Sequence, residues 1–161
     1  MIVDVRNWAD RSLRMSQYLA EQQVPFETLV HPPAFTAQRR AKTLHLSGRQ
    51  VAKTVLLLGP HGYFLAVLAA TQQIDLQRLA EQEGGPVRLA NRDEVAQVFT
   101  DCEWGVTAPF GTQYGLPIYL EESLPADLSI VLELCTHFEA VRLRCRDYER
   151  LEHARRLRFA K

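Results

Sequence analysis

Residues 50–69 read QVAKTVLLLGPHGYFLAVLA, and this stretch carries the clearest structural signal in the chain. Two apolar runs flank a Gly-Pro-His-Gly turn, a pattern that predicts a β-hairpin. Lys53 is the only charge in the first run, and strand alternation puts it on the same face as Val55 and Leu57. A buried ammonium there is costly unless an anion meets it. Two interpretations stay open: Lys53 binds an anionic substrate, or it reaches water from an edge strand.

The composition predicts one folded domain. A chain of 161 residues with 47% hydrophobic content can bury a core of its own and is short for two domains. We therefore expect a single domain over residues 1–161. No apolar run has the length of a membrane-spanning helix, and the N-terminus, with Asp4 and Arg6, lacks the apolar stretch of a signal peptide. These features predict a cytoplasmic protein.

Cysteines and histidines show no metal-binding pattern. The three cysteines, Cys102, Cys135 and Cys145, leave one unpaired in any disulfide scheme, and none has Cys-x-x-Cys spacing. Structural thiols in a reducing compartment are the expectation. The five histidines are scattered without ligand spacing, so we expect no metal and no cofactor.

Charge is segregated along a chain whose formal net charge is zero. Residues 28–74 contain no acidic side chain and carry Arg39, Arg40, Lys42, Arg49 and Lys53. The following segment, residues 75–139, is strongly acidic, and the tail from residue 140 is basic again. This pattern is typical of a positive face that binds phosphate, unless the two signs interleave once the chain folds.

Helix and strand signals alternate without internal repeats. Periodicity and capping residues predict helices over Trp8–Gln23, from a Thr36 cap to Leu44, over Leu76–Gln82 after an Asp75 cap, from an Asn91 cap to Phe99, and over Arg146–Leu157. Besides the hairpin strands, short strands are predicted over Phe26–Val30, Val87–Leu89, Ile118–Leu120, Leu128–Leu134 and Ala140–Cys145. The fold class is therefore α/β, with a mixed sheet or partly closed β-barrel flanked by helices.

An ordered set of short motifs resembles a known family. The set comprises His31-Pro32-Pro33-Ala34, Val51-Ala52-Lys53-Thr54-Val55-Leu56, Leu89-Ala90-Asn91-Arg92-Asp93-Glu94-Val95, Gly105-Val106-Thr107-Ala108-Pro109-Phe110-Gly111 and Leu116-Pro117-Ile118-Tyr119-Leu120. In this order they resemble the YbaK-like family, which is related to the editing domain of bacterial prolyl-tRNA synthetase. The resemblance covers residues 31–134, and the basic helix predicted over residues 146–157 lies outside it. It implies a mixed β-barrel flanked by helices and hydrolysis of a wrong amino acid from tRNA.

The resemblance also implies roles for individual residues. Lys53 matches the family's active-site lysine, while Gly105 and Pro109 match its Gly-x-x-x-Pro loop. A cation in an apolar pocket can bind the phosphate of the terminal adenosine and orient the ester, so Lys53 is assigned to positioning and electrostatics. The glycine lets backbone N–H groups approach the scissile carbonyl. Without the resemblance, this loop would be interpreted as an ordinary turn.

The available chemistry fits ester hydrolysis by water. The sequence contains no Gly-x-Ser-x-Gly elbow and no Ser/His/Asp or Cys/His set, which counts against an ordinary esterase. An aminoacyl ester is already activated and needs a placed water and a polarised carbonyl rather than a strong nucleophile. In the family, the substrate's own ribose hydroxyl is thought to help place that water.

Further candidates for substrate binding are His31, Thr54, Thr107 and Phe110. Two prolines follow His31 and could present its imidazole at the mouth of the pocket, although a lone histidine is more often structural. Thr54 follows the lysine, and Thr107 could bond a substrate group or only its own loop. Phe110, like Phe35 and Tyr63, could stack on adenine or simply fill the core.

Three interpretations remain. The first is a metal-independent trans-editing deacylase that clears a small amino acid of the alanine, serine or threonine class from tRNA. The second is a non-catalytic module that binds tRNA or a synthetase, and the third is a small-molecule hydrolase that reuses the pocket. Expected partners are aminoacyl-tRNA, with its terminal adenosine in the pocket, and an aminoacyl-tRNA synthetase, but neither DNA nor a membrane.

Overall fold

The computed structural model describes residues 5–161, with side chains from residue 13 onward. The prediction about the polar N-terminus at Asp4 therefore lies outside the described residues. Helices α1 to α5 span Val5–Glu21, Ala37–Thr43, Leu76–Glu83, Arg92–Val98 and Cys145–Leu151, and a 3-10 turn covers Gly111–Tyr114. Among the described helices, none is both long and apolar enough to cross a membrane.

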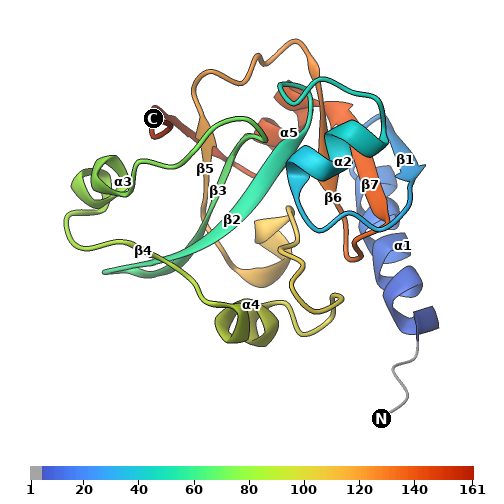
Figure 1. The fold of residues 1–161 in the computed structure, drawn as a ribbon, viewed down its shortest axis with the longest axis horizontal. Helices are drawn as coiled ribbons and strands as arrows, with labels where there is room; N and C mark the ends of the chain where they lie inside the picture. Colours follow the sequence, from blue (N-terminus) through green and yellow to red (C-terminus); the bar gives the residue numbers. More distant parts are fainter. Residues whose placement is uncertain (1–4) are drawn as a thin grey trace.

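The strands form two sheets that meet at β2. One sheet has the order β1-β7-β6 and the other β4-β2-β3-β5-β8 (Figure 1). Strands β1 to β8 span Phe26–Val30, Ala52–Gly59, Gly62–Ala69, Arg88–Leu89, Ile118–Glu121, Ser129–Glu133, Glu139–Arg144 and Arg155–Leu157. Val51 forms an isolated parallel bridge with Val131, whose N–H donates to the Gln50 carbonyl at 2.9 Å. The mixed α/β architecture is confirmed, and the described strands form two sheets rather than a closed barrel.

The hairpin predicted at residues 50–69 is present. β2 pairs antiparallel with β3 from Ala52 opposite Ala69 to Gly59 opposite Gly62. The two-residue turn between them requires a positive φ at Gly62, which is +111° and is easily adopted only by glycine. Local chemistry therefore fixes this register, and with it the position of Lys53.

Helix caps were predicted at the residues where they occur. The Thr36 hydroxyl accepts the Arg39 N–H, and the Asp75 carboxylate accepts two N–H groups of α3. Asn91 and Glu94 form a capping box at the start of α4. These side chains satisfy backbone donors that have no partner within the helix, so the elements begin at those residues.

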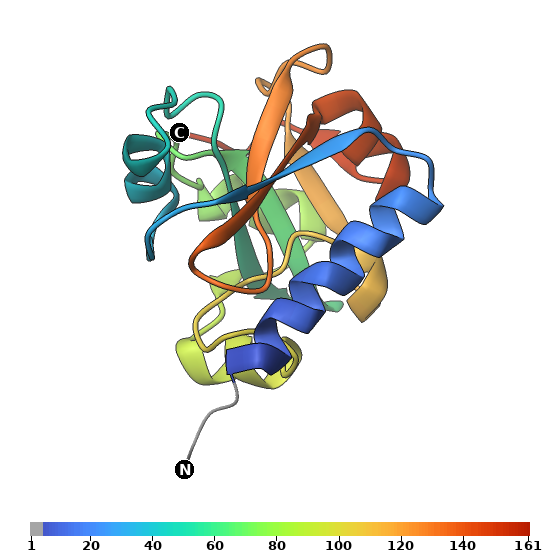
Figure 2. The same ribbon diagram turned by 90° about the vertical axis from the view of Figure 1, so that its right-hand side faces the viewer.

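The largest apolar core lies between the sheets and α1. Met15 and Leu19 of α1 pack with residues of β2, β3, β5, β6 and β7 and with the fully buried Tyr148 of α5. Figures 1 and 2 both show α1 beside the three-stranded sheet. This core fixes the two sheets against each other, so that the junction at β2 has a defined geometry.

The predicted C-terminal helix over residues 146–157 is too long. The helix α5 ends at Leu151, and β8 pairs parallel with β5 at the edge of the five-stranded sheet. Tertiary contacts decide this change, because the buried Glu121 carboxylate accepts the N–H groups of Phe159 and Ala160. Just beyond α5, the Glu152 carboxylate accepts from Thr112 and Tyr18 in the interior.

The cysteine expectation needs a similar correction. Cys102 and Cys135 form a disulfide, while Cys145 is a buried free thiol. Sequence spacing gave no sign of the pair, because 33 positions separate the two residues and only the fold brings their Cα atoms to 4.6 Å. The bond ties the loop before Gly105 to the end of β6.

Candidate active site

A cavity of about 400 Å³ opens where the two sheets meet. Its walls come from the start of α2, the start of β2, the loop at Gly105 and the end of β6. The lining residues are Phe35, Thr36, Ala37, Gln38, Arg40, Ala52, Lys53, Thr54, Val55, Ala70, Gly105, Thr107 and Glu133. Elements that are far apart in the sequence therefore build one concave site, as ligand sites commonly do.

Lys53 is the cation of this cavity that lacks a fixed partner. It is half-buried, and burial lowers the pKa of its ammonium because desolvation disfavours the charged form. Among the described residues, no carboxylate forms an ion pair with it. Strand β3 pairs with one edge of β2 along its whole length, but β4 pairs with the other edge only at Leu57 and Leu58. That second edge therefore borders the cavity along the first half of β2. An anionic ligand would supply the missing counter-charge.

The loop that carries Gly105 has an alternating pattern. Val106, Ala108 and Phe110 are buried in the core, while Gly105 and Thr107 line the cavity. Gly105 has a φ of +87°, and a Cβ there would lie 3.6 Å from His137 Nε2. The positive φ therefore favours glycine at this position, whereas a Cβ would make only an ordinary contact with His137.

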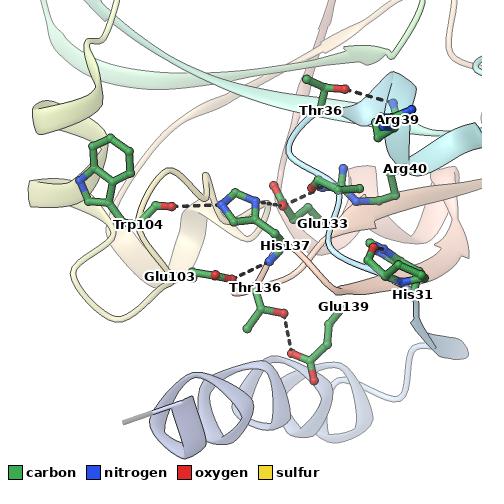
Figure 3. A network of polar contacts seen from close by, with 12 residues as sticks. His31, Thr36, Arg39, Arg40, Glu103, Trp104, Glu133, Thr136, His137 and Glu139 are labelled. Carbon is green, nitrogen blue, oxygen red and sulfur yellow. Dashed lines mark hydrogen bonds and ion pairs between the residues drawn. The ribbon is translucent and has the colours of Figure 1, made fainter. Parts of the chain in front are cut away.

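A polar network centred on His137 anchors the loop before Gly105 (Figure 3). His137 Nε2 bonds the Trp104 carbonyl at 3.0 Å, and the His137 N–H donates to the Glu103 carboxylate at 2.9 Å. His137 Nδ1 lies 3.0 Å from Glu133 Oε1, which also accepts from Arg40 at 2.7 Å. The network therefore links the loop, β6 and α2 around one carboxylate.

The hydrogen bonds of the network indicate how its members are charged. Both ring nitrogens of His137 face acceptors, an arrangement that favours the doubly protonated, cationic imidazole. Burial by itself lowers the pKa of His137, but the Glu133 hydrogen bond and charge outweigh it and the pKa is raised. Among the charged residues that line the Lys53 cavity, Glu133 is compensated by Arg40, which leaves Lys53 as the surplus positive charge.

This assignment predicts a pH-dependent stability. Because the folded-state pKa of His137 is raised, its contribution is fully present below the unfolded pKa, near 6.5, and is lost as pH rises through the folded pKa. The free energy of unfolding in urea between pH 5.5 and 9 should therefore fall more steeply in the wild type than in His137→Gln. His61→Gln, an exposed histidine in the hairpin turn, is the control. Parallel profiles for wild type and His137→Gln would contradict a charged His137.

The predicted site residues do not all reach the cavity. Lys53, Thr54, Gly105 and Thr107 line it, but Pro109 does not. The Pro109 carbonyl accepts from the Tyr148 hydroxyl at 2.6 Å, which anchors the far end of the loop in the core.

Three of the ring side chains considered earlier lie elsewhere. Phe110 is fully buried and packs edge-on against Tyr18 and Tyr148, so it contributes to the core in this structure. His31 is buried behind Arg40, where Nδ1 donates to the Pro32 carbonyl at 2.8 Å and Nε2 has no partner among the described residues. Burial lowers the pKa of His31, which favours its neutral form. The Tyr63 hydroxyl donates to the Glu94 carboxylate at the end of the hairpin, away from the cavity. Of the three aromatic residues considered for stacking on adenine, Phe35 is the one that lines the cavity.

Sequence reasoning missed Arg40, Glu133 and His137. The criterion that singled out Lys53 would also have found Glu133, because it is the only charge between Asp127 and Glu139 in an apolar strand region. No comparable local signal marks His137, which lies in a turn after β6. Its importance comes from contacts with Trp104 and Glu133 that only the fold creates.

One group of side chains has the donor types of a metal site. Asp101, Cys102 and Cys135 place one ligand atom each within 4.8 Å of one another. Both sulfurs belong to the disulfide, and the Asp101 carboxylate accepts from the Tyr114 hydroxyl at 2.7 Å. None of the three lines the Lys53 cavity, so we assign the group to structure.

Comparisons with known proteins agree with this architecture. A family model described as the aminoacyl-tRNA editing domain matches residues 31–151. Among curated proteins, none matches the chain. A crystal structure of a proposed trans-editing enzyme for prolyl tRNA synthetase superposes with a TM-score of 0.79 at 22% identity, covering 94% of this chain and 97% of the other.

Two further structures share the fold. A hypothetical protein superposes with a TM-score of 0.78 at 18% identity, over 92% of this chain and 99% of the other. A proposed signal transduction protein from Marinobacter aquaeolei VT8 gives a TM-score of 0.70 at 19% identity, over 92% of this chain but 30% of that one. At these identities the likeness shows the fold alone, whereas the family model spans most of the sequence. The chain therefore belongs to the aminoacyl-tRNA editing domain family, the YbaK/ProX family of aminoacyl-tRNA deacylases.

Proposed function

We propose that this protein is a trans-editing deacylase that hydrolyses the ester between tRNA and a small misattached amino acid of the alanine, serine or threonine class, without a metal ion. The observation that carries the proposal is Lys53, a half-buried ammonium without an ion-pair partner in a cavity that also exposes Gly105. Small side chains at Ala37, Ala52 and Ala70 leave room beside the lysine. The editing reaction belongs to the cytoplasm, where we expect the protein to act.

In the proposed reaction, the protein binds the end of the tRNA and polarises the ester carbonyl, while a water molecule attacks the carbonyl carbon. The Lys53 ammonium holds the phosphate of the terminal adenosine, and backbone N–H groups near Gly105 stabilise the negative charge that develops on the ester carbonyl oxygen. The water oxygen bonds to the carbonyl carbon, and the bond from that carbon to the ribose oxygen breaks. One water proton ends on the ribose oxygen, which gives free tRNA and the amino acid.

Thr54 and Thr107 are proposed to select the amino acid. Both hydroxyl-bearing side chains line the cavity together with Lys53 and Gly105. A difference of one methyl or hydroxyl group in such a pocket changes discrimination by about 1–3 kcal/mol. His31 and Phe110, which the structure buries, would act only by supporting the walls.

The alternatives differ in how binding responds to salt. We expect the affinity for uncharged tRNA, measured by filter binding, to fall at least about tenfold between 50 and 200 mM salt, because each neutralised phosphate releases counterions. Binding of adenosine 5′-monophosphate is the matched control and should change much less. A salt-independent affinity for tRNA would favour a small-molecule protein, whereas salt-dependent binding without deacylation would favour a non-catalytic module.

A further inference from the structure

A second cavity, of about 560 Å³, adjoins the Lys53 cavity. The two share Phe35 and Gly105 as walls. The remaining lining residues of the second cavity are Ala90, Arg92, Val95, Glu103, Trp104 and His137. It lies between α4 and the loop before Gly105, and its walls are mainly apolar.

Two aromatic side chains at this cavity are unusually exposed. Trp104 is 57% exposed and Phe35 is 74% exposed, and neither belongs to an apolar core cluster. The Arg92 guanidinium lies 5.7 Å from the Trp104 ring centroid, and the Phe35 ring lies 4.7 Å from that of His137. Aromatic rings presented to solvent beside cations are the features that bind unpaired nucleobases by stacking.

The electrostatics of the second cavity also suit a nucleotide. Arg92 is exposed, and both ring nitrogens of His137 face acceptors, which favours a cationic ring. The acid in the lining, Glu103, accepts the His137 N–H, so part of its charge is already compensated. A ligand with a flat apolar face and a flanking phosphate would therefore meet complementary groups.

We propose that this cavity binds the base of the nucleotide that precedes the terminal adenosine, stacked between Trp104 and Phe35. This inference rests on the proposed function, because the shared walls would bind consecutive nucleotides of a single-stranded acceptor end. The terminal adenosine occupies the Lys53 cavity, and the chain passes Gly105 to reach the second one. Arg92 stabilises the stack and the adjoining phosphate.

Fluorescence gives a direct test, because the chain has two tryptophans, Trp8 and Trp104. In a Trp8→Phe background, the dinucleotide cytidylyl-adenosine should quench Trp104, whereas adenosine 5′-monophosphate should not. Phe35→Ala should weaken dinucleotide binding about tenfold, as expected for loss of one base–aromatic stack. Leu128→Ala, which removes another exposed apolar side chain away from both cavities, should leave binding unchanged.

Kinetics separate this inference from the proposed function. With charged tRNA, Trp104→Ala should raise KM about tenfold with little change in kcat, and Trp104→Phe should recover most of the loss. The inference fails if Trp104→Ala leaves both KM and dinucleotide affinity unchanged while the wild type deacylates. It also fails if adenosine 5′-monophosphate alone quenches Trp104, or if only an apolar peptide binds there. A wild type that hydrolyses no ester but still binds the dinucleotide through Trp104 would overturn the deacylase proposal alone.

Discussion

Lys53→Ala is expected to lower the rate of aminoacyl-tRNA hydrolysis by about a hundredfold or more. The ammonium is half-buried, no described carboxylate pairs with it, and it faces a cavity whose other charges are mutually compensated. Removing it takes away both the phosphate anchor and the positive potential at the reacting ester. Single-turnover deacylation, followed by loss of labelled amino acid from tRNA, measures the effect.

Two matched variants make the result interpretable. Lys42→Ala removes an exposed lysine of α2 that does not line the cavity, so its rate should stay near that of the wild type. Lys53→Arg keeps the charge but replaces a compact ammonium with a larger, planar guanidinium, and we expect an intermediate rate. Equal rates for Lys53→Ala and Lys42→Ala would remove Lys53 from the reaction.

Glu133→Gln is expected to reduce the free energy of unfolding by about 3 kcal/mol. Arg40 has a side-chain exposure of only 3%, and Glu133 is its ion-pair partner at 2.7 Å. The substitution leaves a buried guanidinium without a counter-charge, and it replaces the carboxylate that accepts from His137 Nδ1 with a neutral amide. Urea unfolding at neutral pH, monitored by circular dichroism, measures the change.

The control for this prediction is a surface ion pair. Glu27 pairs with Arg142 at 3.2 Å, but its side chain is 60% exposed, so Glu27→Gln should change stability by less than about 0.5 kcal/mol. The double variant Arg40→Met/Glu133→Gln should be less destabilised than Glu133→Gln alone, because it no longer leaves a buried guanidinium without a counter-charge. If Glu133→Gln behaves like Glu27→Gln, the network does not depend on charge compensation.

Elements with a local chemical signal were predictable from the sequence. The Gly59–Gly62 hairpin, the Thr36 and Asp75 caps and the Asn91–Glu94 capping box depend on residues within a few positions of one another. Lys53 was recognisable because a lone charge in an apolar strand is costly unless an anion or water compensates it. Local signals therefore located the part of the cavity that β2 provides.

Features that depend on distant partners were not predictable. The chain beyond Leu151 turns into β8 because Glu121 and β5, some thirty residues earlier, offer it hydrogen bonds. Likewise Phe110 is buried because the end of its loop packs against Tyr18 and Tyr148, while Thr107 faces the cavity. Sequence motifs indicate which segment matters, but packing decides which of its side chains face the substrate.

The measurement that tests the account most directly is a deacylation time course on tRNAs charged with alanine, serine, threonine, cysteine or proline. We expect the wild type to clear at least one ester of the alanine, serine or threonine class much faster than a blank without protein, and Lys53→Ala to clear it slowly while remaining folded by circular dichroism. If the wild type clears none of these esters faster than the blank, the proposed deacylase activity is contradicted.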